Sequence, residues 1–172
     1  SLTSSDGTTL LDFYIFGAQE EDVSTGRIDD GEVLWVTLPS PTPNAHNQIS
    51  CGVRAYDATD STSNLASIDL EGAPSLGTDV DLNLSDFPAG KNAYVVLGTS
   101  SLSEDYAESD VISLVGDIRN QSVTVTDVTG SAKLTFSVPS HLSLVGRRFY
   151  LQAATIGSDI VASNGLEVVI CP

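Results

Sequence analysis

The residues of this chain that could carry chemistry are mainly carboxylates. Asp57 lies three residues before Asp60 in a polar stretch, and Glu104 directly precedes Asp105. Oxygen ligands gathered on loops are what Ca²⁺ prefers in proteins, but neither pair has the spacing of an EF-hand loop. These four residues are the candidate ligands for calcium, and we expect no other cofactor.

The two histidines do not stand in a catalytic pattern. His46 follows a proline-rich connector, and His141 lies in the turn Pro139-Ser-His-Leu142. A catalytic base must be held against a nucleophile and oriented by a third group, and the sequence suggests no such set. We therefore predict a protein that is not an enzyme and has no catalytic residues, with a small hydrolase as the remaining enzymatic alternative.

The two cysteines indicate an oxidising compartment. Cys51 and Cys171 are the only thiols, and an isolated pair in an exported protein usually oxidises. The bridge would close a loop of about 120 residues, worth roughly 4 to 5 kcal/mol before strain. The chain contains no methionine, so we expect a processed product, exported with its signal peptide removed. The expected location is extracellular or at the cell surface.

The charge excludes two kinds of partner. Seven basic residues against 23 acidic ones give a net charge of −16, which argues against nucleic acid and against a basic membrane-binding patch. No apolar run of about 18 residues is present, so no membrane span is expected. The acidity fits either solubility in a salty medium or binding of divalent cations.

The most β-prone segment covers residues 8–16. Its apolar residues occupy both faces of an extended chain: Leu10, Leu11, Phe13, Tyr14, Ile15 and Phe16. A strand that is apolar on both faces needs burial on both faces. It is either a central strand of its own sandwich or a strand given to a neighbouring molecule, and in the second case these six residues form the polymerisation strand.

The rest of the chain has an all-β pattern. Two further N-terminal strands are expected at 32–38, with Trp35 in the core, and at 49–57, whereas 19–31 is expected to be a loop. Further strands are predicted at 78–84, 92–98, 110–115, 121–126, 131–138, 147–156 and 165–171. This spacing is typical of a β-sandwich or jelly roll of about ten strands. We expect one domain over residues 1–172, in which the N-terminal strands complete the sheets.

Residues 72–171 resemble a known module. The resemblance lies in Leu144-Val-Gly-Arg-Arg-Phe-Tyr-Leu-Gln152, in Ala162-Ser-Asn-Gly-Leu166, and in Gly72-Ala-Pro-Ser-Leu-Gly-Thr78 before an alternating strand. Together they look like the C-terminal module of secreted and surface proteins of planctomycetes and related marine bacteria. The resemblance implies a secreted β-sandwich and brings no catalytic residues.

These observations favour a structural role. We expect a non-enzymatic extracellular protein, the subunit of a homopolymeric surface filament whose copies are joined by strand exchange. The alternative is a secreted, calcium-dependent module that binds a polysaccharide or another protein. The expected partners are therefore copies of the chain itself or an extracellular polysaccharide.

Overall fold

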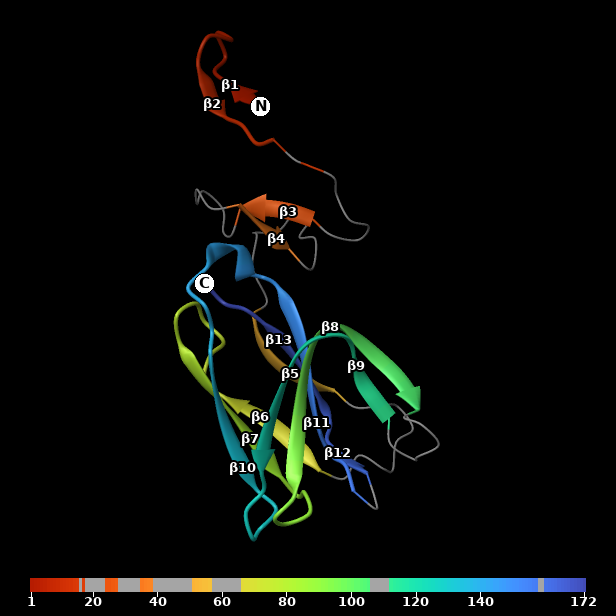
Figure 1. Ribbon diagram of the computed structural model, residues 1–172. Helices are drawn as coiled ribbons and strands as arrows, with labels where there is room; N and C mark the ends of the chain where they lie inside the picture. Colours follow the sequence, from red (N-terminus) through yellow and green to blue (C-terminus); the bar gives the residue numbers. More distant parts are fainter. Residues whose placement is uncertain are drawn as a thin grey trace.

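A computed structural model describes residues 1–15, 17, 24–27, 35–38, 51–56, 66–105, 112–157 and 160–172, without the side chains of 36–38, 103–105 and 112. The regular structure of these residues is almost entirely β, as Figure 1 shows. The one helix among them is the short 3-10 helix η1 (Leu142–Leu144). The predicted all-β sandwich is thus confirmed.

The larger sheet holds six antiparallel strands. In spatial order they are β5 (Gly52–Tyr56), β13 (Gly165–Val169), β11 (Arg148–Thr155), β8 (Asn92–Asp105) and β9 (Ile112–Val125), and the short β12 (Val161–Ala162) also pairs with β11. The smaller sheet has the order β10 (Ala132–Ser137), β7 (Asp79–Ser85), β6 (Ser67–Glu71). Both sheets are antiparallel.

The core lies between these two sheets. On β7 every second residue is buried, with Val80, Leu82 and Leu84 inside and polar side chains outside. This is the period of two that a strand with one solvated face requires. Ala93 and Val95 of β8 belong to the same buried cluster. The alternation in the sequence therefore places the small sheet face to face with the large one.

Strands β8 and β9 form one long hairpin with a bend. Its pairing register shifts between Leu97 and Gly98, and Asp117 on the opposite strand has a φ of 45°. Beyond the bend the hairpin runs away from the plane of the sheet, as Figure 1 shows. The sequence predicted two separate strands at 110–115 and 121–126. That prediction was wrong because the chain absorbs the irregularity as a bulge and continues to pair.

The N-terminal region forms two small hairpins. β1 (Leu2–Thr3) pairs with β2 (Leu10–Asp12), and β3 (Ser24–Arg27) pairs with β4 (Trp35–Leu38). In Figure 1 both hairpins lie beyond the end of the sandwich that carries η1. Of the three N-terminal strands expected to complete the sheets, β5 is the one that joins a sheet of the sandwich within the described part of the chain.

Two further boundaries differ from the prediction. The strand expected over 8–16 is regular only at Leu10–Asp12, and part of the loop expected over 19–31 is strand β3. Strand β6 was not predicted, because its acidic residues hide the buried Ile68 in a short segment. The single domain over 1–172 stays a prediction.

Candidate assembly site

The N-terminal segment has one exposed apolar face. Leu11, Phe13 and Ile15 occupy alternate positions and expose 59%, 58% and 82% of their surface. Leu10 is exposed as well, and Phe16 lies outside the described residues. Alternate residues of an extended chain share a face. The structure therefore leaves a row of three large apolar side chains in solvent.

The opposite face of this segment contacts the β3–β4 hairpin. Arg27 Nη2 donates to both carboxylate oxygens of Asp12 at 2.7 Å, and this bond lowers the pKa of the Asp12 carboxyl. The Tyr14 ring stacks on Trp35 with 4.0 Å between the ring centroids, and the Arg27 guanidinium lies 5.0 Å from the Trp35 centroid. Trp35, predicted in the core, is half-buried in this cluster instead.

A cavity of about 310 Å³ lies between the two sheets at the η1 end of the sandwich. Its lining is almost wholly apolar and comes from both sheets: Leu70, Val80, Phe136, Leu97, Phe149 and Val168. Phe136, Leu97 and Phe149 are only half-buried, whereas Val80 behind them is buried. The interior of a domain is usually close-packed. The described residues thus leave this end of the core incompletely filled.

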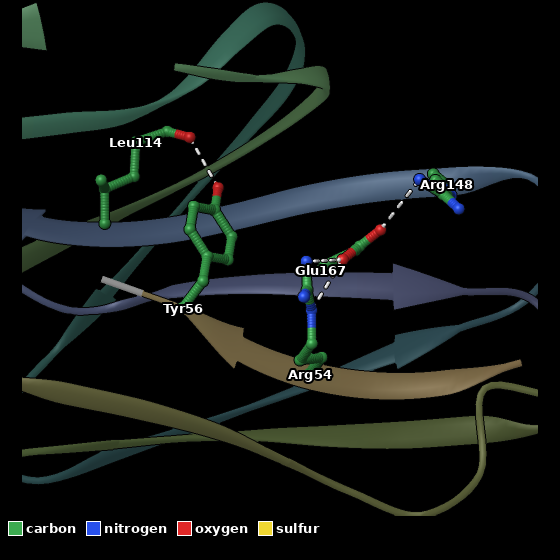
Figure 2. Close-up of polar contacts among 5 residues, drawn as sticks. All are labelled: Arg54, Tyr56, Leu114, Arg148 and Glu167. Atoms are coloured by element: carbon green, nitrogen blue, oxygen red, sulfur yellow. Dashed lines mark hydrogen bonds and ion pairs between the residues drawn. The ribbon is translucent and has the colours of Figure 1, made fainter. Parts of the chain in front are cut away.

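A polar network crosses the outer face of the large sheet, as Figure 2 shows. The Glu167 carboxylate on β13 is nearly buried and accepts two hydrogen bonds from Arg54 on β5, at 2.6 and 3.0 Å. Arg148 on β11 lies 3.4 Å from its other oxygen. A buried carboxylate requires such partners. Here the charge is satisfied by the two neighbouring strands and fixes their register.

In the same figure Tyr56 reaches from β5 to the long hairpin. Its hydroxyl donates to the Leu114 carbonyl at 2.6 Å, and the Leu114 N–H donates to Gln152 Oε1 at 2.9 Å. The distal half of the β8–β9 hairpin is thereby bonded to the outer face of the large sheet. Burial, followed by the charges of Tyr150 and Glu167, raises the pKa of Tyr56 to about 12.

The predicted disulfide is present. Cys51 and Cys171 are bonded with 5.1 Å between their Cα atoms, and the bridge joins the chain just before β5 to the chain just after β13. Among the described residues β5 pairs only with β13, so the bridge fastens this edge strand to its neighbour.

The other residues singled out by sequence do not form a site in the described part of the chain. Asp57, Asp60 and His46 lie outside it, as do the side chains of Glu104 and Asp105, whose backbones pair with β9. No group of three ligating side chains occurs among the described residues. His141 Nδ1 lies 2.7 Å from Ser143 Oγ and accepts from the Ser143 N–H, which makes it the N-cap of η1.

Sequence reasoning missed Arg27, and it noted Asn164 only as part of a motif, without its side-chain hydrogen bonds to the backbone of Ile68. Arg27 lies in a segment expected to be a loop, and a lone arginine gave no signal. Within the described residues, no helix is long and apolar enough to cross a membrane. Comparison of the chain with models of protein families and with curated proteins gave no match.

Proposed function

We propose that this chain is a non-enzymatic extracellular structural protein whose copies join into a filament by donating the segment around residues 10–15 to the next copy. The observation that carries the proposal is the exposed row of Leu11, Phe13 and Ile15 on a chain whose own core is incompletely filled. A head-to-tail contact of this kind does not close on itself and generates a fibre. The resemblance of residues 72–171 to a module of surface proteins agrees with this role.

The energetics favour burial of the row in another molecule. Fully burying one exposed Leu, Ile or Phe side chain stabilises by roughly 1.5 to 3 kcal/mol. The three side chains already shield about a third of their surface, so their burial in a partner adds about 3 to 6 kcal/mol in total. The loss of translational and rotational freedom on association costs about 4 to 15 kcal/mol. Side-chain burial alone therefore offsets only the lower part of the cost of association. Backbone hydrogen bonds along the inserted strand must supply the rest.

The disulfide supports an extracellular location. Bridges of this kind persist in oxidising environments and are rare where glutathione keeps thiols reduced. The acidic surface, with a net charge of −16, keeps free subunits apart until a specific contact forms.

The test compares assembly of the full chain with that of a double variant. Purified protein is followed by sedimentation velocity and negative-stain microscopy as its concentration is raised. Phe13→Asp with Ile15→Asp should abolish filaments, because two charges cannot enter an apolar groove. The control is Val128→Asp, which changes an apolar residue that is 93% exposed in the turn between β9 and β10.

The assembly of the wild type and the two variants decides the proposal. Filaments in the wild type and in Val128→Asp, with monomers only in the double variant, would support the proposal. A wild-type chain that stays monomeric at all concentrations, or a double variant that assembles like the wild type, would refute it.

A further inference from the structure

The geometry points to strand β10 as the edge that receives the donated segment, with the apolar row of a second copy entering the cavity between the sheets. This inference rests on the proposed function and names the surface that the function requires. It follows from a comparison of the four edge strands that close the two sheets: β10 and β6 in the small sheet, and β5 and β9 in the large one.

The backbone of β10 offers an open edge. Val138, next to its end, donates to the Thr78 carbonyl at 2.8 Å and accepts from the Gly77 N–H, so this position bonds toward the β7 side. In an antiparallel pair such positions alternate. Lys133, Thr135 and Ser137 therefore direct their N–H and C=O groups away from β7. Among the described residues, no strand pairs with β10 on that side.

The side chains of β10 offer an incomplete apolar face. Ala132, Leu134 and Phe136 point into the sandwich but are only half-buried, whereas the matching residues of β7 are buried. Phe136 and Ser137 line the cavity. A strand added beside β10 would place alternate side chains over this row and into the cavity. Leu11, Phe13 and Ile15 have that spacing.

The edge of β6 is already occupied around Ile68. Asn164 Oδ1 accepts from the Ile68 N–H at 2.8 Å and Asn164 Nδ2 donates to the Ile68 carbonyl at 3.2 Å. The Ala66 N–H donates to the Ala162 carbonyl at 3.2 Å. These bonds occupy both outward backbone groups of Ile68 and the N–H of Ala66, which an added strand would need.

The two edges of the large sheet match the apolar row less well. On β9 the residues that face the small sheet are polar: Asn120, Ser122 and Thr124, opposite Leu97, Val95 and Ala93. The hollow beside β5 is lined by Val53 and Val169, but the charged side chains of Arg54, Arg148 and Glu167 also line it. Burying apolar side chains against such groups would strip them of water without new hydrogen bonds.

The occupant is a second copy rather than the same molecule. Asp12 and Tyr14 hold the segment against Arg27 and Trp35 in the β3–β4 hairpin. In Figure 1 that hairpin lies beyond the η1 end of the sandwich, while β10 runs along the sandwich itself. These contacts hold the segment at the β3–β4 hairpin, where Leu11, Phe13 and Ile15 stay exposed and another molecule can take them up.

Photo-crosslinking of the full chain tests the acceptor. Protein with the substitution Phe13→p-benzoylphenylalanine is mixed with ¹⁵N-labelled wild-type protein, and the mixture is assembled and irradiated. Mass spectrometry then identifies the crosslinked tryptic peptides. We expect labelled peptides that span residues 134–147, which contain Leu134 and Phe136 and are released by cleavage after Lys133 and Arg147. The matched control carries the same group in place of Val128.

The outcomes separate the acceptor from the assembly itself. Crosslinks between copies that fall only on other peptides would overturn β10 and leave strand donation standing. Crosslinks only within one molecule, together with an absence of filaments, would overturn both.

A second pair of variants tests the edge without a probe. Thr135→Pro removes an N–H that points away from β7, so the ladder inside the sheet keeps its bonds. Both variants lose the 2.6 Å hydrogen bond from the Thr135 hydroxyl to Asp81, but Thr135→Ala keeps the backbone N–H. Proline should raise the concentration needed for assembly at least tenfold over alanine. Equal assembly of two folded variants would contradict an acceptor role for β10.

Discussion

Asn164 acts toward Ile68 as a strand would, since its side-chain amide bonds both the N–H and the C=O of that residue. Ile68 lies on an edge strand and its side chain is buried in the core. Asn164 directly precedes β13. Its side-chain amide therefore caps the edge of the small sheet at Ile68 and ties that sheet to the start of β13.

Replacing Asn164 by Ala should lower the free energy of unfolding by about 1 to 3 kcal/mol, because both backbone groups of Ile68 lose their partners. Urea denaturation measures the change. Asn83→Ala is the control: its amide makes one 3.3 Å bond to Asp69 on the solvated face, and its loss should cost less than about 0.5 kcal/mol. Equal decreases in the free energy of unfolding for the two variants would show that the bonds to Ile68 stabilise the fold no more than a surface hydrogen bond does.

Gly98→Ala should destabilise the bent hairpin by roughly 1 to 3 kcal/mol. A Cβ at this position would clash with the Gly116 carbonyl oxygen and lie 2.6 Å from Val115 Cγ1, both in the paired strand. Gly116→Ala is the matched control, since its Cβ would meet the Ser100 hydroxyl, which can rotate away. Thermal unfolding should rank wild type above Gly116→Ala and Gly116→Ala above Gly98→Ala. The reverse order would contradict the bend described here.

Tyr56 should make the fold sensitive to alkali. Its folded pKa is about 12 against an ordinary value of 10.0, so the unfolded phenol loses its proton first as the pH rises. Between these values the unfolded state binds fewer protons, and stability falls. The contribution is fully present below pH 10.

Tyr56→Phe tests this point. At pH 8 it should cost about 0.5 to 1.5 kcal/mol through the lost bond to Leu114. The variant should then lose less stability than the wild type between pH 10 and pH 12, as followed by urea denaturation. Parallel curves for the two proteins across this window would contradict the assignment.

Replacing both cysteines by Ser should lower stability by up to about 4 to 5 kcal/mol, because the bridge spans 120 residues and restricts the unfolded chain. Reduction of the wild type under denaturing conditions, followed by refolding with the thiols blocked, should give the same loss. A change below about 1 kcal/mol would mean that the bridge restricts the unfolded chain far less than its loop length implies.

The sequence predicted those strands whose side chains alternate between buried and exposed, and it predicted the disulfide. The alternation in 78–84 and 131–138 identified β7 and β10, and the isolated cysteines identified the bridge. The N-terminal row was visible as alternate apolar residues on one face of an extended segment, but the pattern did not tell which of the two faces packs within the chain. That distinction depends on Arg27 and Trp35, which come from elsewhere in the chain.

The remaining features depend on pairing between distant strands. Glu167 meets Arg54 only because β13 pairs with β5 in one register, and no local pattern states that register. Asn164 was noted as part of a motif, but its bonds to Ile68 require β6, which was not predicted. The open edge of β10 likewise becomes visible only once its pairing with β7 is known.

The position of the bridge also decides what happens when the chain is pulled by its N-terminal segment. Tension carried along the backbone from residues 10–15 arrives at Cys51 before it reaches β5, and there it passes through sulfur directly to Cys171. Without the disulfide, the force would separate β5 from β13 by breaking their hydrogen bonds one after another. This is the easiest way to open a sheet from its edge. With the disulfide, residues 52–170 form a closed covalent loop that cannot be drawn out. A pull on the N-terminal segment therefore cannot draw out the part of the chain between the two cysteines.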